Sequence, residues 1–179
     1  FTTFMQYAIA AGTYCRTINA RETMLLKDIG WRTMVTLGLS GSPMLEAGGG
    51  ATVMATLSGA CSLPVTVNLS FTGSATLNSD YTRSATSITI PAGSLSGTIT
   101  LTSIADTLYE PNETVIVAIS SVVNGTESGT QYVTATIPND DPSPTVTLGL
   151  TGSPLAEAGG AATVTATLSA LSGYATTVS

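Results

Sequence analysis

The sequence predicts an all-β protein: an immunoglobulin-like, seven-stranded antiparallel β-sandwich, followed by part of a second sandwich. Three observations predict this fold class. Apolar and polar residues alternate with a period of two, clusters of Gly, Pro, Asn and Asp separate the alternating segments, and the beginning of the pattern recurs near the C-terminus. Seven short strands within about 105 residues are typical of an immunoglobulin-like sandwich.

The alternation places the strands of the complete domain. Segments such as 64–71 and 97–103 alternate apolar with polar residues and are rich in Val, Ile and Thr, as half-buried antiparallel strands are. No helical pattern is found after residue 33. We expect strands near residues 35–40, 51–57, 64–71, 85–90, 97–103, 114–122 and 131–138.

An internal repeat sets the domain organisation. Residues 35–68 align with 146–179 at a constant offset of 111, and 21 of these 34 positions are identical. A period of about 110 residues is a whole domain rather than a solenoid unit. The second copy covers roughly a third of a sandwich, too little to close a core. Either the chain is a fragment of a longer tandem array or the partial copy pairs with another molecule.

The predicted parts of the chain therefore differ in character. Residues 1–33 are slightly basic and carry no repeat pattern; they could form a short helix or strand, belong to a preceding domain, serve as a docking arm or be a disordered leader. The complete sandwich, the linker and the partial second repeat follow as residues 34–141, 142–145 and 146–179.

Composition excludes several classes of function. The chain has no His, so a Ser-His-Asp or Cys-His catalytic pair and a His-ligated zinc are excluded. Two cysteines cannot form a four-thiolate metal site. A net charge of −6 argues against a nucleic-acid partner, and no apolar stretch is long enough to span a membrane. Cys15 and Cys61 could pair, although buried or incidental thiols are the favoured alternative, since the repeat has Ser172 opposite Cys61.

The acidic residues concentrate at one end of the predicted sandwich. If successive strands run alternately up and down, the odd-numbered connections lie at the same pole, and only Glu127 falls at the other one. Crowded carboxylates repel one another unless a cation neutralises them, and Arg83 is the only base after residue 32. Oxygen ligands without His or Cys select hard cations, and a flexible cage of several loops suits Ca²⁺ better than Mg²⁺. The seven predicted metal ligands are Glu46, Asp80, Asp106, Glu110, Glu113, Asp140 and Asp141.

A family resemblance covers the complete repeat. The segments that carry it are Glu46-Ala-Gly-Gly, Phe71-Thr-Gly-Ser-Ala-Thr, Ser79-Asp-Tyr, Ile90-Pro-Ala-Gly, Asp106-Thr-Leu-Tyr-Glu-Pro-Asn-Glu and Ile137-Pro-Asn-Asp-Asp. In this order they resemble a Calx-β domain. The resemblance implies a Greek-key sandwich that binds Ca²⁺ at one end through the seven acids above. The Calx-β domain of the sodium–calcium exchanger has further aspartates at two positions where this chain has Ala105 and Asn139. With fewer carboxylates, we expect only one or two ions.

Two functions follow as expectations. The first is a calcium-binding, non-catalytic structural or adhesive repeat of a large secreted or cell-surface protein. Its partners are neighbouring repeats or identical chains, with a possible cell-surface or matrix partner. The segment Asp140-Asp-Pro-Ser-Pro is both ligand loop and linker, so Ca²⁺ is expected to rigidify the junction between repeats. The alternative is a self-assembling subunit of an extracellular filament or matrix that exchanges strands between chains.

Overall fold

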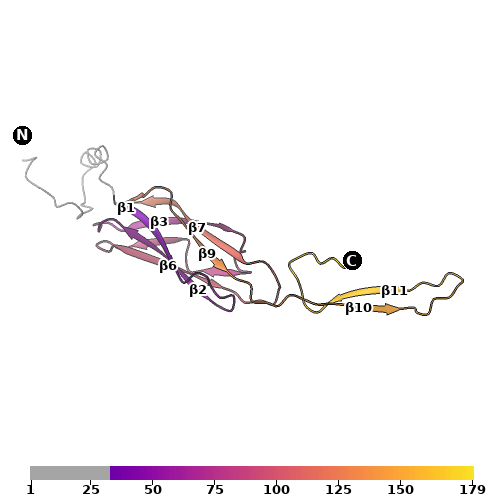
Figure 1. The fold of residues 1–179 in the computed structure, drawn as a ribbon. Coiled ribbons are helices and arrows are strands. Elements are labelled where there is room, and N and C mark those ends of the chain that lie inside the picture. The colour runs from indigo at the N-terminus through magenta and orange to yellow at the C-terminus, as the bar shows by residue number, and fades with distance from the viewer. Residues whose placement is uncertain (1–32) are drawn as a thin grey trace, which may run out of the picture.

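The computed structural model describes residues 33–179, and within this range every regular element is a strand. Two sheets face each other in a sandwich, and a separate hairpin follows (Figure 1). The first sheet has the order β4 (Tyr81–Arg83), β6 (Ser96–Ser103), β2 (Gly50–Leu57), β1 (Met34–Ser40) and β8 (Thr126–Glu127). The second sheet has the order β5 (Ser87–Ile90), β3 (Val65–Gly73), β7 (Glu113–Val123) and β9 (Tyr132–Ile137). The hairpin is formed by β10 (Val146–Thr151) and β11 (Thr163–Leu168).

The predicted all-β sandwich is confirmed. Each of the seven predicted strands is present, with both ends within two residues of the predicted bounds. The structure adds β4 and β8, which have three and two residues and are too short to show a periodic pattern in the sequence. Among residues 33–179, no helix is long and apolar enough to cross a membrane.

The core lies between the two sheets and follows the alternation of the strands. In β2 the burial pattern alternates strictly from Ala51 to Leu57, and the outward positions are threonines and Met54. Such a strand buries one face against the opposite sheet and leaves the other in water. The largest fully buried side chains come from both sheets and from the β1–β2 connection: Met44, Ile88, Ile90, Leu101, Val35, Val53, Val65, Val67, Val115 and Val117.

The pairing of the strands collects several strand ends at one pole. Antiparallel partners place Glu113 beside Ile137, Gly73 beside Val115, and Tyr81 beside Ser103. The chain segments that leave β1, β3, β6 and β9 and those that enter β4 and β7 therefore share this pole. We call it the acidic pole, because it carries the seven predicted ligands named above.

The partial second repeat folds as the beginning of the first one does. β10 pairs with β11 in the same register as β1 with β2, so Val146 faces Leu168 as Val35 faces Leu57. Their surroundings differ, since every residue of β10 and β11 is exposed. The hairpin extends away from the sandwich (Figure 1), and no second sheet covers it within the described residues.

Cys61 lies at the pole opposite the acidic one, in the connection between β2 and β3. Its side chain is buried, at 3% exposure, and it is disulfide-bonded. The favoured alternative of a buried or incidental thiol is therefore wrong for Cys61. Cys15, the other half of the predicted pair, lies outside the described residues, as does the whole segment 1–32.

The repeat offers a matched pair of substitutions that tests where the core lies. Val53 is fully buried, whereas Val164, at the equivalent position of the hairpin, is 65% exposed. We expect Val53→Ala to lower the free energy of unfolding of the sandwich by about 2 kcal/mol, because it leaves a cavity. Val164→Ala should change it by less than about 0.5 kcal/mol. Urea denaturation followed by circular dichroism measures both values, and equal costs would contradict the burial difference.

Candidate metal centre

Two groups of carboxylates form at the acidic pole. Glu46, Asp140 and Asp141 make one group, and Asp80, Glu110 and Glu113 make the other. In each group, one oxygen from every residue lies within 4.8 Å of the others. Asp106 belongs to neither group but lines the same small cavity as Glu46, Asp80, Glu110 and Glu113. The structure thus places all seven sequence-predicted site residues together.

The turn between β1 and β2 positions Glu46. The Gly49 N–H donates to the Leu45 carbonyl at 2.7 Å, and Gly49 approaches Leu45 so closely that a Cβ would lie 2.2 Å from the Leu45 nitrogen. The buried Ser103 hydroxyl at the end of β6 is within hydrogen-bonding distance of the Leu45 and Gly49 carbonyls, at 2.5 and 2.9 Å. This fixed turn explains the Glu-Ala-Gly-Gly motif, and it leaves Glu46 only 6% exposed.

Asp80 stands one residue before β4 and is held by the main chain on both sides. Its N–H donates to the Thr76 carbonyl at 2.9 Å, and its carboxylate accepts the N–H of Thr76. Its own carbonyl accepts the N–H of Ile104, at 2.9 Å, where the chain leaves β6. Asp80 is therefore tied to the segment that leads to Asp106.

The segment from β6 to β7 carries three of the carboxylates. Asp106 accepts the N–H of Leu108 at 2.7 Å through its side chain, a local turn that aspartate favours. The Glu110 N–H donates to the side-chain oxygen of Asn139 at 3.1 Å, and Glu113 is the first residue of β7. The loop is thus anchored at its start, at its middle and at its end.

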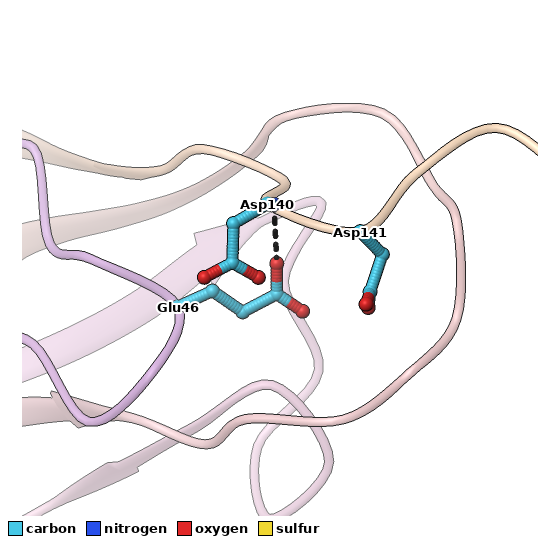
Figure 2. Close-up of side chains that lie close together, drawn as sticks. All are labelled: Glu46, Asp140 and Asp141. Carbon is cyan, nitrogen blue, oxygen red and sulfur yellow. Dashed lines mark hydrogen bonds between the residues drawn. The ribbon is translucent and has the colours of Figure 1, made fainter.

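The segment after β9 completes the first group of carboxylates. In Figure 2 the main chain of Asp140 lies against the Glu46 carboxylate, and the Asp140 N–H donates to Glu46 Oε2 at 3.0 Å. The Asp141 side chain points toward the same carboxylate from the other side (Figure 2). Among the described residues, Asp141 Oδ2 is the buried side-chain polar atom that has no hydrogen-bond partner. A buried oxygen of this kind is costly unless a cation or water binds it.

Asn139 is a functional residue that sequence reasoning missed. Its side-chain oxygen accepts the Glu110 N–H, and its side-chain amide donates to the Asp141 carbonyl at 2.9 Å. Its own N–H donates to the side-chain oxygen of Asn112 at 3.1 Å. The residue therefore ties the β6–β7 loop to the Asp140–Asp141 segment. An ionised aspartate side chain at this position would have no N–H to donate to the Asp141 carbonyl. From the sequence alone Asn139 is a missing ligand, whereas in the structure its side chain links the loops that carry the two groups of carboxylates.

The electrostatics of the site show that the carboxylates lack a cationic partner among residues 33–179. Burial, and then the charges of Asp140, Asp106 and Asp141, raise the pKa of Glu46, although the Asp140 N–H partly opposes this. Burial and neighbouring carboxylates likewise raise the pKa of Glu110. Arg83 is the only basic side chain among residues 33–179, and its guanidinium lies 4.2 Å from the centre of the Phe71 ring.

Glu113 shows the largest of these shifts. Its pKa is raised from the ordinary value of 4.5 to about 7, and burial is the largest cause. A side-chain hydrogen bond with Asp80 and the negative charges of Asp80, Glu110 and Asp106 act in the same direction. Without a cation, this site holds a proton near neutral pH to reduce the repulsion between its carboxylates.

The donor set fits a small hard cation. Its ligand atoms are oxygens, and hard divalent cations prefer such ligands. The cavity between the loops is about 10 Å³, which has room for about one water-sized sphere rather than an organic substrate. The buried Asp141 Oδ2 without a partner is a further ligand atom that a cation would satisfy.

The two remaining acids of residues 33–179 lie apart from these groups. Glu127 is in β8, and its carboxylate accepts the N–H of Gln131 at 2.6 Å. Glu157, the counterpart of Glu46 in the second repeat, is exposed. Within the described residues it belongs to neither carboxylate group, in agreement with a second repeat that has only one of the seven ligands.

Comparison with known proteins supports the fold assignment. No family model matches the sequence. No curated protein sequence matches it either. The structure is similar to the crystal structure of CBD12 from CALX1.2, with a TM-score of 0.52 and 18% identity over 60% of this chain; the match spans 46% of that chain, less than half of its length. It is also similar to the crystal structure of the apo form of the Calx CBD1 domain, with a TM-score of 0.53 and 18% identity over 62% of this chain and 99% of that one. At this identity the likeness establishes the fold, and it confirms the resemblance to Calx-β domains at that level.

The raised pKa values predict how the stability of the metal-free protein depends on pH. Between pH 4.5 and about 7 the folded protein binds more protons at Glu113 than the unfolded chain does, so stability falls as the pH rises through this window. Glu46 and Glu110 contribute in the same direction. In the presence of a chelator, we expect the melting temperature to decrease from about pH 5.5 to 7.5. Glu113→Gln should flatten this dependence and Glu127→Gln should leave it unchanged; a melting temperature that rises over the window would contradict the shifts.

Proposed function

We propose that this protein is a calcium-binding structural repeat whose acidic pole holds one or two Ca²⁺ ions. One observation carries the proposal: seven carboxylates from four chain segments meet where no basic side chain of residues 33–179 neutralises them. The arrangement raises the pKa of three of these groups. Repulsion among the carboxylates opposes folding. A bound divalent cation would replace this repulsion with attraction between the ion and the carboxylates, and would therefore stabilise the folded state.

The chemistry of the ligands favours Ca²⁺ over other metals. Cysteine and histidine, the usual ligands of zinc and copper, are absent from both groups of carboxylates. The ligands come from four separate connections between strands. Ca²⁺ accepts six to eight oxygens in irregular geometry, whereas Mg²⁺ demands a near-ideal octahedron. The match of the quoted motifs to Calx-β domains, together with the shared fold, supports the same choice.

Each group would contribute to the binding of one ion. The first would use Glu46, Asp140 and Asp141, and the second Asp80, Glu110 and Glu113, with Asp106 beside both. When bound, the ion supplies positive charge and orders the oxygens around it. Asn139 and Ser103 stay outside these groups and hold the loops at a fixed separation.

The location of the site gives the ion a mechanical role. Asp140 and Asp141 stand directly before Pro142-Ser-Pro144, the link to the second repeat. Fixing the two aspartates shortens the flexible part of the link, and the prolines stiffen the remainder. We therefore propose that Ca²⁺ rigidifies the junction between repeats. This role suits a non-catalytic structural or adhesive array of a secreted or cell-surface protein, which contacts neighbouring repeats or identical chains and a surface or matrix partner.

A second candidate function is self-assembly through the hairpin. The apolar side chains of Leu148, Leu150 and Val164 are exposed, whereas their counterparts in the first repeat pack in or against the core. Exposed strands of this kind accept strands of another chain, as expected for a subunit of an extracellular filament or matrix. The comparison of Val53→Ala with Val164→Ala separates the candidates, because a hairpin covered by a second chain makes the two substitutions similarly costly.

Calorimetric titration tests the metal site. We expect the wild-type protein, stripped of metal, to bind Ca²⁺ and to bind Mg²⁺ more weakly. Asp80→Asn and Asp141→Asn, one in each group, should each lower Ca²⁺ affinity by about tenfold or more, because each removes a charged ligand. Glu127→Gln, at the opposite pole, serves as the matched control and should bind as the wild type does. An absence of heat from Ca²⁺ in the wild type, with no rise in its melting temperature, would refute the proposed site.

Small-angle scattering tests the proposed role at the junction. In the presence of Ca²⁺ we expect one extended envelope with a narrow distribution of shapes, and with chelator a broader distribution, since repulsion among the carboxylates is then not neutralised and weakens the contacts that hold the Asp140–Asp141 segment. Asp141→Asn should resemble the chelated state under both conditions. Identical scattering curves with and without Ca²⁺ in a protein that binds Ca²⁺ would show that the ion does not control the junction.

A further inference from the structure

The second repeat contacts the loop that carries the metal ligands. Residues 171–174 follow β11, and Ser172 forms a parallel β-bridge with Tyr109, which lies one residue before the predicted ligand Glu110. The Gly173 N–H donates to the Tyr109 carbonyl at 2.9 Å. The Tyr174 and Tyr109 rings lie 5.5 Å apart between centroids, at an angle of 45°, within the range in which aromatic pairs attract each other. Main chain and side chains thus both take part.

The contact needs the glycine at its centre. A Cβ on Gly173 would lie 3.2 Å from the Glu110 Cβ and 3.5 Å from both Glu110 Oε2 and the Tyr109 carbonyl oxygen. A larger side chain would push the two segments apart or displace the Glu110 carboxylate. Gly173 therefore packs closely against the Glu110 side chain. The Glu110 N–H is held separately, by the side-chain oxygen of Asn139.

The topology of tandem repeats brings these two surfaces together. In the first repeat the β2–β3 connection lies opposite the acidic pole, where Cys61 accepts the N–H of Gly93 from the β5–β6 connection. Residues 171–174 are the same connection in the second repeat, by the offset of 111. Only residues 142–145 link the acidic pole of the first repeat to the start of the second. The pole of the second repeat that carries residues 171–174 therefore meets the acidic pole of the first repeat.

The sequences of the two repeats diverge at this connection. All seven positions of 59–65 differ from their counterparts 170–176, although 21 of the 34 aligned positions are identical. In particular, Ser62 and Leu63 of the first repeat stand where the second has Gly173 and Tyr174. Seven of the 13 differences between the copies fall in this run, as expected of a connection adapted to its own preceding neighbour.

We propose that the connection of residues 171–174 is a docking surface for the metal-ligand loop of the preceding repeat. The partner is a sandwich of the same kind, recognised through the main chain and ring of Tyr109. The contact is made by protein atoms, and it lies against the segment that contains Glu110. Docking of one repeat therefore shapes the ion site of the repeat before it, a consequence that rests on the proposed function.

Two glycine substitutions in the full chain test the docking surface. Gly173→Val should abolish the contact, because the added side chain meets Glu110. Gly149→Val, in β10, is the matched control, since its Cβ would have no neighbour closer than 4.0 Å. Amide hydrogen exchange, measured by NMR with a chelator present, reports docking directly. We expect slow exchange of the Gly173 amide in the wild type and in Gly149→Val. Fast exchange of the amide at position 173 is expected in Gly173→Val, because its bond to the Tyr109 carbonyl is lost.

Calcium titration of the same proteins tests the effect on the ion site. We expect Gly173→Val to lower Ca²⁺ affinity about fivefold, and Gly149→Val to leave it unchanged. Tyr174→Ala should also lower Ca²⁺ affinity, with Tyr132→Ala, at an exposed tyrosine of β9, as its control.

If the Gly173 amide exchanges in the metal-free wild type as fast as in an unstructured peptide, the docking surface is refuted, whether or not Ca²⁺ binds. If Gly173 is protected and no Ca²⁺ binds, the docking surface stands and the proposed function fails. Equal Ca²⁺ affinities in the wild type and Gly173→Val would overturn the effect on the ion site.

Discussion

Repulsion among carboxylates at one pole of the sandwich is the constraint on which the rest of the structure depends. Like charges that share a site disfavour ionisation, and burial adds to the effect. The chain places seven acids there and leaves its only described base, Arg83, over an aromatic ring. The apolar core between the sheets must hold the pole together against this repulsion.

The fold resists this repulsion with main-chain hydrogen bonds close to the charges. Glu46 accepts the N–H of Asp140, and the Thr76 N–H donates to the carboxylate of Asp80. The bond from the Asp140 N–H favours the ionised form of Glu46 and so partly opposes the rise of its pKa. The neutral amide of Asn139 links the loops without adding another negative charge. The ligand groups are therefore shaped in advance, which reduces the conformational entropy that ion binding must overcome.

The repeat shows that one sequence pattern has different consequences in different surroundings. β1 with β2 and β10 with β11 share their register and most of their residues. Val53 is nevertheless buried by the opposite sheet, and Val164 is exposed. The local hairpin follows from alternation and turns, whereas burial requires strands from elsewhere. The connection after β11 meets the acidic pole through residues that the first repeat does not share, so divergence of the copies is informative about contacts between repeats.

The sequence by itself determined the strands and the pole at which the acids gather. Period-two alternation is a local property, so the seven longer strands were predictable to within two residues, and the parity of the connections placed Glu46, Asp80 and Asp141 together. Tertiary structure alone decided that the acids separate into two groups, that Asp106 stands beside both, and that Asn139 joins them. It also decided the pairing of β4 and β8, which are too short for a pattern, and the contact of Gly173 with Tyr109. These features depend on hydrogen bonds and close approaches between residues distant in sequence, and no local periodicity encodes such distances.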